Sequence, residues 1–140
     1  MLKEVIEEFE DIVEFNVQGE SNVKAYFSDE LGLTNVPTGV IEFYEEYDGA
    51  RLSINDVFSL EEIKQELEDF DIFLKAMGLN PDTDKYVPIA NDGMGGYYAF
   101  LSNSDEETIY YLDHEFPDNI NSYESFEDFL RDICEMDADL

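Results

Sequence analysis

Hydrophobic residues in the first half of the chain recur every three or four positions, which is the spacing of one face of an α-helix. The segment from Leu2 to Val13 shows such a stripe, with acidic residues over its other faces. A second stripe runs from Pro37 to Tyr47, and a third begins after Ser59 and ends before Gly78. The pattern predicts three helices whose apolar faces contribute to a buried core.

Sequence signals mark the ends of these helices. Ser59 and Glu62 form a capping box, in which the hydroxyl and the carboxylate each accept a hydrogen bond from a free amide at the start of the third helix. Pro37 is expected at the first position of the second helix, where a missing N–H removes no hydrogen bond. Gly49 is expected to end that helix in the left-handed conformation, before a short strand at residues 51–54.

The second half of the chain changes to strands rich in Tyr, Phe and Ile. Asn91-Asp92-Gly93 is expected to supply the positive φ angles of a hairpin turn, and a polar loop over residues 102–107 joins the next pair of strands. Residues 16–27 alternate only weakly and are interpreted as a loop or a short strand. The predicted strands are Tyr86–Ala90, Gly96–Leu101 and Thr108–Leu112.

A final helix is predicted after Ser125, with Phe126, Phe129, Leu130 and Ile133 turned inward. Helices, then successive hairpins, then a helix do not make a β-α-β series. The order predicts an α+β fold: a single antiparallel, meander-rich sheet with helices packed mainly on one face. We interpret residues 1–140 as one domain.

Composition agrees with a folded, reduced protein. The 140 residues are 44% hydrophobic and include 11 Phe and 9 Tyr, unlike a disordered acidic tail. The single cysteine, Cys134, excludes an internal disulfide and is expected as a small apolar residue within a helix. Acidic residues interrupt the N-terminal apolar positions, so no signal peptide or membrane span is predicted, and we expect a cytoplasmic protein.

The charge balance narrows the possible partners. Asp and Glu number 36 against 7 Lys and Arg, which gives a net charge of -29. Such a chain repels nucleic acids and anionic membranes, because binding to them depends on basic residues that neutralise phosphates. It attracts basic proteins. Solubility, or adaptation to high salt, is the alternative explanation of the acidity.

Motifs for catalysis or metal binding are weak. Asp92-Gly93-Met94-Gly95-Gly96 resembles a phosphate-binding loop, but a predicted strand follows it in place of a helix and it contains no lysine. His114 is the only histidine, and neither a nucleophile elbow nor a zinc-ligand set accompanies it. We therefore expect no enzymatic activity, no cofactor and no metal, and a hydrolase is poorly supported.

Several segments in order resemble one known family. They are Val36-Pro37 with Phe43-Tyr44 and Tyr47-Asp48-Gly49, then Phe58 to Ile63, Val87 to Ala90, Gly95 to Tyr98, Ile109 to Glu115, and the helix after Ser125. Together, over about residues 28–133, they are similar to the SUKH superfamily, which includes a yeast cell-wall-synthesis regulator and many bacterial immunity proteins. The resemblance implies an α+β fold without enzymatic activity and, in bacteria, binding and neutralisation of a cognate toxin, often a nuclease.

Two functional hypotheses follow. The first is an immunity protein that neutralises a basic, nuclease-type toxin, and the alternative is an intracellular regulatory or scaffold domain that binds other proteins. For the first, carboxylates near turn ends are the candidate contacts, because such positions can gather several charges without disturbing the core. The candidate partner-binding residues are Glu42, Glu45, Glu46, Asp48, Asp92, Asp113 and Glu115.

Overall fold

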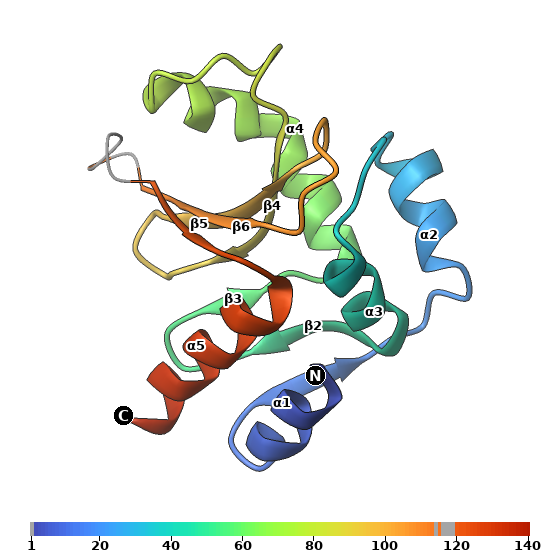
Figure 1. The fold of residues 1–140 in the computed structure, drawn as a ribbon, viewed down its shortest axis with the longest axis vertical. Helices are drawn as coiled ribbons and strands as arrows, with labels where there is room; N and C mark the ends of the chain where they lie inside the picture. The colour runs from blue at the N-terminus through green and yellow to red at the C-terminus, as the bar shows by residue number, and fades with distance from the viewer. Residues whose placement is uncertain (1, 114, 116–119) are drawn as a thin grey trace.

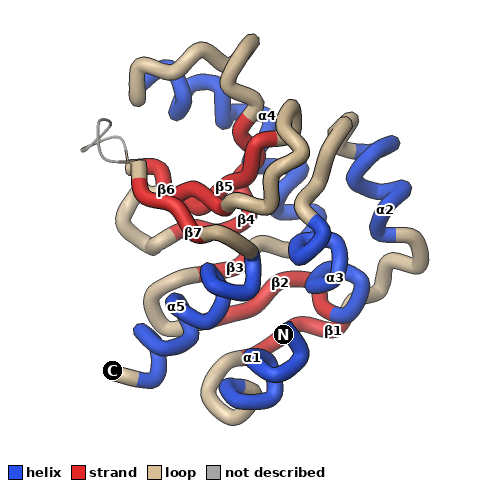
Figure 2. The backbone as a smooth tube through the Cα atoms, viewed as in Figure 1, coloured by secondary structure: helices blue, strands red, loops and turns tan. Residues whose placement is uncertain are grey.

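A single sheet of seven antiparallel strands organises the part of the chain that the computed structural model describes, namely residues 2–113, 115 and 120–140 (Figure 1). Each strand pairs with the next one along the chain, so the whole sheet is a meander (Figure 2). The strands are β1 (Glu14–Val17), β2 (Tyr47–Arg51), β3 (Asp56–Val57), β4 (Tyr86–Asn91), β5 (Tyr97–Leu101), β6 (Ile109–Leu112) and β7 (Asn121–Tyr123).

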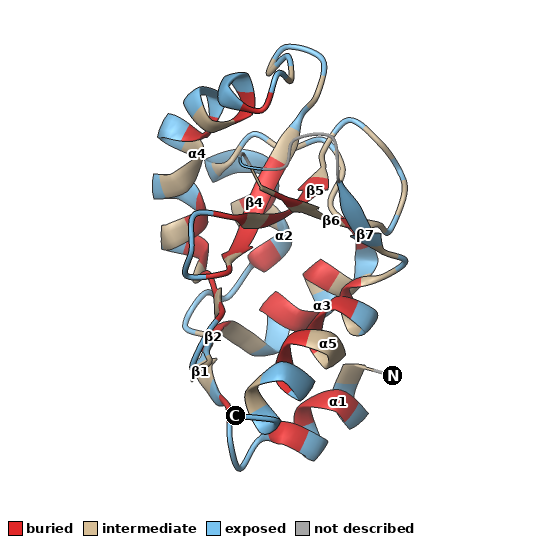
Figure 3. Cartoon of the chain, turned by 90° about the vertical axis from the view of Figure 1, so that its left-hand side faces the viewer, coloured by how far each residue is buried: buried red, intermediate tan, exposed pale blue. Residues whose placement is uncertain are grey.

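Helices cover both faces of this sheet unequally. The helices are α1 (Leu2–Phe9), α2 (Val23–Ala25), α3 (Thr38–Glu46), α4 (Leu60–Ala76) and α5 (Phe126–Ala138), and a π-helical turn, η1 (Tyr26–Glu30), follows α2. Figure 3 shows α4 on one side of the strands and α1, α3 and α5 on the other. The α+β class, with one antiparallel sheet and helices mainly on one face, is confirmed.

Alternation along β5 explains the two layers, because successive side chains of a strand point to opposite faces. The Tyr98 ring lies 4.8 Å from that of Phe129 in α5, between ring centroids. The Tyr97 ring lies 5.1 Å from Phe70 and 4.8 Å from Phe73, both on α4. The larger core lies on the α5 side, and a smaller apolar cluster lies under the second half of α4.

The predicted start of α4 is confirmed in atomic detail. The Ser59 hydroxyl accepts a hydrogen bond from the Glu62 amide at 3.1 Å, and the Glu62 carboxylate accepts one from the Ser59 amide at 2.9 Å. Arg51 adds a charged hydrogen bond to Glu62 at 3.0 Å. Burial alone would raise the pKa of Glu62, but the bonds from Ser59 and Arg51 outweigh it and lower that pKa.

The expected end of the second helix is wrong. Pro37 is the N-cap of α3 and not its first residue, and the chain passes from Glu46 directly into β2. Gly49 therefore lies within a strand, with φ +87°. A Cβ there would lie 2.5 Å from the Val57 carbonyl oxygen, so the close approach of β2 to β3 requires glycine. Of the strand expected at residues 51–54, only Arg51 lies in a strand, as the last residue of β2.

Other boundaries also shift. In the β4–β5 turn the positive φ angles belong to Gly93 and Gly95, not to Asn91 or Asp92, whose side chains instead accept hydrogen bonds from turn amides. The first helix ends at Phe9, and a turn carries the chain to β1. The segment interpreted as loop or short strand holds the end of β1, then α2 and η1. The short strands β3 and β7 were not predicted.

Two further sequence predictions concern burial and membranes. Cys134 is fully buried in α5, as expected, and burial raises the pKa of its thiol to about 12. Among the residues placed by the structure, no helix combines the length and the apolar character that crossing a bilayer requires.

We expect Gly49→Ala to lower the free energy of unfolding by about 3 kcal/mol, because it combines a positive φ with a clash against the β3 backbone. Urea unfolding measures the change. Gly19→Ala is the matched control, since a Cβ at Gly19 meets no atom within 4 Å. Equal stability of the two variants would contradict the packing described for β2.

Candidate protein-binding surface

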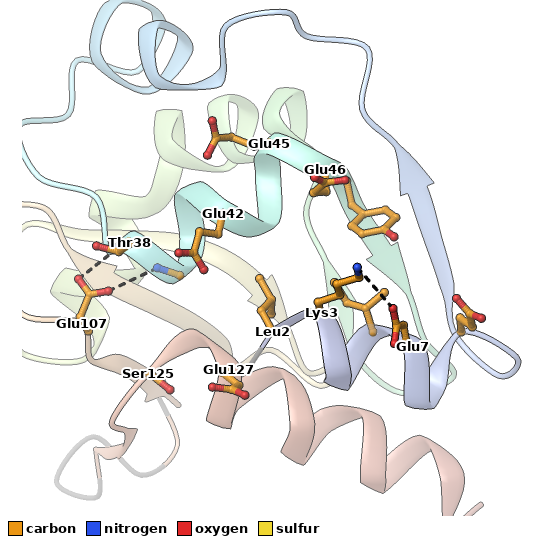
Figure 4. Close-up of a pocket in the computed structure, with 14 residues that line it drawn as sticks. Leu2, Lys3, Glu7, Thr38, Glu42, Glu45, Glu46, Glu107, Ser125 and Glu127 are labelled. Atoms are coloured by element: carbon orange, nitrogen blue, oxygen red, sulfur yellow. Dashed lines mark hydrogen bonds and ion pairs between the residues drawn. The ribbon is translucent and has the colours of Figure 1, made fainter.

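A groove with acidic walls opens between α1, α3 and the start of α5 (Figure 4). Its volume is about 980 Å³. Seven glutamates and one lysine line it, so its electrostatic character is strongly negative. The lining residues of this acidic groove are Leu2, Lys3, Ile6, Glu7, Glu10, Thr38, Gly39, Glu42, Glu45, Glu46, Tyr47, Glu107, Ser125 and Glu127.

Helix ends of both polarities border the groove: the first residues of α1, α3 and α5 line part of it, and the C-terminal ends of α1 and α3 lie beside Glu10, Glu45 and Glu46. α1 ends at Phe9 and α3 ends at Glu46, and neither has a basic residue in its last turn. The unpaired carbonyl groups at a helix C-terminus act as roughly half a negative charge, and an acidic side chain there costs about 0.3–1 kcal/mol. Glu45 and Glu46 occupy the last turn of α3, where their charges oppose helix stability.

The glutamates of the groove differ in how far they are engaged. The Glu107 carboxylate accepts hydrogen bonds from the amides of Thr38 at 3.0 Å and Gly39 at 3.4 Å, so it caps the start of α3. Glu7 lies 4.0 Å from the ammonium of Lys3, a pair that is largely in solvent. These two carboxylates therefore have roles within the fold.

Three of the predicted contact residues meet in the groove. Glu42, Glu45 and Glu46 are exposed and follow one another along α3, and Figure 4 shows Glu46 nearest to Lys3 and Glu7 of α1. Their spacing of three and four positions places them on one side of the helix. Within the described part of the chain, no hydrogen bond or ion pair engages these three carboxylates, so they are available to a partner.

Asp48 does not line the groove and is engaged elsewhere in the fold. Its carboxylate accepts a hydrogen bond from the Leu60 amide at 2.8 Å, and its carbonyl oxygen accepts one from Asn16 at 3.3 Å. Asp48 therefore joins β2 to the start of α4 and to β1. A substitution at this position would disturb those joints as well as any binding.

Asp92 serves the β4–β5 turn. Only 6% of it is exposed, and its carboxylate accepts hydrogen bonds from the amides of Met94 at 2.8 Å and Gly96 at 2.9 Å and from the Tyr111 hydroxyl. Burial would raise the pKa of Asp92, but these hydrogen bonds outweigh it and lower the pKa. A Cβ on Gly96 would lie 2.5 Å from this carboxylate, which is why the turn needs glycine there.

The remaining predicted contacts lie after β6. The Asp113 carboxylate accepts a hydrogen bond from the Glu115 amide at 2.9 Å, and Glu115 is exposed. Figure 1 shows the β4–β5 turn well away from α3, so the seven predicted residues form two groups rather than one surface. His114 lies outside the described residues. Over the ranges that the structure describes, no group of His, Cys, Asp or Glu is arranged to hold a metal ion.

Sequence reasoning missed half of the groove. Glu7 comes from α1, Glu10 from the turn after α1, Glu107 from the β5–β6 loop and Glu127 from α5. No local pattern links these segments, because only the tertiary fold brings them together. The one local signal was the helical spacing of Glu42, Glu45 and Glu46, which groups those three residues.

Comparison with protein families gives one match. The model of the SMI1 / KNR4 family (SUKH-1) is similar to this chain over residues 25–132, about three quarters of its length. A comparison with individually curated proteins gives no match. The match includes α3 and most of α5, whereas α1, which forms another wall of the acidic groove, precedes it.

The buried tyrosines predict an alkaline limit of stability. Burial, with the nearby carboxylates of Asp92 and Asp132, raises the pKa of Tyr98 to about 12. Burial and the bond to Glu106 raise the pKa of Tyr110 to about 12. In the folded state these two hydroxyl groups therefore stay protonated above pH 10, whereas tyrosine hydroxyls of the unfolded chain ionise near pH 10. Their contribution to stability is complete below pH 10, and we expect it to fall between pH 10 and 12.

Urea unfolding at several pH values in this range, for the wild type and Tyr98→Phe, measures the effect. The variant lacks one of the tyrosines whose pKa the fold raises, so its stability should fall less steeply. An identical pH dependence in both proteins would contradict the assignment to Tyr98.

Proposed function

Because the chain belongs to the SMI1 / KNR4 family (SUKH-1), we propose that it is an immunity protein that binds a basic, nuclease-type bacterial toxin and neutralises it. The observation that carries the proposal is the acidic groove, with seven glutamates in its lining and three unengaged glutamates along α3. Family membership supports binding of a protein partner, and the charge of the groove selects a basic one.

The physical mechanism is occupation of a cationic surface. A nuclease binds its substrate through Lys and Arg that contact phosphates, and these side chains are complementary to a row of carboxylates. Glu42, Glu45 and Glu46 would engage them, and the bulk of the chain would block access of the nucleic acid. No chemical step is part of this proposal.

Opposite net charges on the chain and its partner also raise the rate at which the two associate. Long-range attraction between a partner of positive charge and a chain of net charge -29 accelerates encounter, and salt screens it over about 8–10 Å. Speed matters for neutralisation, because the toxin must be captured before it reaches its substrate.

The four other predicted residues have different places in this proposal. Asp48 and Asp92 are engaged within the fold, so we assign them to the scaffold of the surface. Asp113 and Glu115 lie at the end of β6 and would add to the attraction at longer range. The contact itself is assigned to α3.

We expect the triple variant Glu42→Gln, Glu45→Gln, Glu46→Gln to bind the toxin encoded by the adjacent gene roughly 10- to 100-fold more weakly, since each exposed ion pair contributes up to about 1 kcal/mol. Slower association that depends less on salt should account for much of the loss. The melting temperature should stay unchanged or rise, because two of the three charges oppose the α3 dipole. Stopped-flow association rates and thermal unfolding measure both.

The matched control is Glu68→Gln, Asp69→Asn, Asp71→Asn, which removes as many charges from exposed positions of α4, on the other side of the sheet. It should bind almost as the wild type does. If both variants weakened toxin binding equally, only the net charge of the chain would matter, and the glutamates of α3 would have no specific role. If the wild-type chain does not protect cells from that toxin, the immunity function is wrong, and the regulatory or scaffold alternative takes its place.

A further inference from the structure

A second, smaller depression lies at the other end of α5. It has a volume of about 290 Å³ and lies between the β4–β5 turn, the loop before β3 and the last turns of α5. Tyr98, Tyr111 and Tyr123 form its inner surface, and Ile54, Met94 and Met136 form its exposed edge. We call this depression the tyrosine hollow.

Hydrogen bonds and backbone packing fix the residues that line the hollow. Asp92 fixes the turn that carries Met94, as described above. Gly93 packs on the backbone of Ile54, where an added Cβ would lie 2.8 Å from the carbonyl oxygen. The buried Asn55 side chain links two residues of the hollow. Its amide oxygen accepts a hydrogen bond from the Tyr98 hydroxyl at 3.4 Å, and its amide nitrogen donates to the Met136 sulfur at 4.0 Å.

Apart from the exposed Asn121 amide, the polar side chains of the hollow are already engaged. The Tyr111 hydroxyl donates to Asp92, and the Tyr123 hydroxyl donates to Asp132 at 2.6 Å. Across the described residues, every buried side-chain nitrogen and oxygen has a hydrogen-bond partner. The hollow therefore has ring faces and methyl groups to offer an incoming group, and these suit an apolar side chain better than a polar ligand.

Its edge is unusually apolar for a free surface. Met94 is 80% exposed, Ile54 40% and Met136 37%. Methionine and tyrosine are enriched at protein interfaces, and the flexible methionine side chain adapts to the shape of a partner. Burying these three side chains would release a hydrophobic free energy that the isolated chain leaves unused.

Charge decides what kind of molecule can cover this edge. The ionisable side chains at or beside the hollow are acidic: Asp92 and Asp132 behind the tyrosines, and Asp137, whose carboxylate accepts from the Ser53 amide at 2.6 Å. Among the described residues that line the hollow, none is Lys or Arg. A second copy of this chain would bring acid against acid, with -29 on each side, so a self-dimer is disfavoured.

We infer that the tyrosine hollow receives one large apolar side chain, such as leucine, from a protein segment in which lysine or arginine flanks that side chain. The inference rests on the proposed function for the choice of partner, which is the same basic toxin. α5 lines the acidic groove at Glu127 and the hollow at Met136, about 14 Å further along the helix axis and on the opposite side of the helix, so a partner that contacts both sites must extend around α5. The groove then supplies attraction, and the hollow supplies a hydrophobic anchor.

A peptide titration tests the hollow without the toxin. The probe is a blocked five-residue peptide with leucine at its centre and lysine elsewhere, and the comparison peptides replace leucine by glycine or lysine by glutamate. Methyl NMR follows Met94, Met136 and Ile54, with Ile72 on α4 as an exposed aliphatic control. We expect the leucine–lysine peptide to shift the three methyl signals of the hollow, and the other two peptides to leave them nearly unshifted.

Shifts that are equal for the glycine peptide, or that appear equally at Ile72, would overturn the inference. So would equal binding of the glutamate peptide, or signals of the hollow that change with protein concentration alone, which would indicate a self-dimer. Met94→Ser should weaken the peptide about fivefold, and Ile72→Ser should not weaken it.

Measurements of toxin binding then distinguish the proposal for the hollow from the proposed immunity function. Met94→Ser should speed dissociation of the toxin about fivefold with little change in association, whereas the α3 variants chiefly slow association. If Met94→Ser leaves dissociation unchanged while the α3 variants lose binding, the hollow is wrong and the immunity function stands. If the peptide occupies the hollow but the chain does not neutralise the toxin, the apolar–basic specificity stands and the immunity function is wrong.

Discussion

The structure depends on the joint at which α3 becomes β2 and meets the start of α4. Tyr44 is fully buried, and its hydroxyl donates a hydrogen bond to the Phe58 carbonyl oxygen at 2.5 Å. Four residues later, the Asp48 carboxylate accepts from the Leu60 amide. The next residue, Gly49, lets β2 approach the backbone of Val57 closely. α3 is thereby held in one orientation relative to the sheet, and its exposed glutamates face the acidic groove.

The chain tolerates its high negative charge because almost all of its carboxylates lie at the surface. Of the residues that the structure describes, Asp92 is the one buried carboxylate, and its hydrogen bonds compensate for its burial. Most of the remaining acid lies on the surface over a core of aromatic and aliphatic residues. A few of these carboxylates, such as those of Asp48, Glu62 and Glu107, also accept hydrogen bonds from backbone amides. The seven basic side chains relieve little repulsion, and four of them already pair with carboxylates: Lys3, Arg51, Lys64 and Arg131.

The position of the acid supports the proposed binding role over solubility alone. Solubility requires charge anywhere on the surface, whereas Glu45 and Glu46 lie where the helix dipole disfavours them. Their presence beside another helix C-terminal end, in a groove without compensating cations on α3, favours selection for a basic partner. The apolar edge of the hollow is likewise unfavourable in the isolated chain, and a partner that covers it would account for it.

Local rules allowed much of the fold to be predicted from the sequence. The capping box at Ser59, the Gly78 stop, the three strands after residue 85 and the helix after Ser125 follow from short-range chemistry, and the structure contains them. The end of α3 was missed because Asp48-Gly49 is also a helix-stop sequence, and the packing of β2 on β3 outweighs that local signal. Two-residue β3 has no periodicity to detect. The groove joins segments up to 125 residues apart, so sequence reasoning found only the part carried by α3.

Hydrogen exchange of the amides, measured with and without an inactive form of the toxin encoded by the adjacent gene, tests the central claim most directly. The account predicts slower exchange in α3 (Thr38–Glu46) and in the β4–β5 turn at residues 92–96 when the partner is bound, with α4 (Leu60–Ala76) unchanged. Protection confined to α4, with α3 and the turn exchanging as in the free chain, would contradict it.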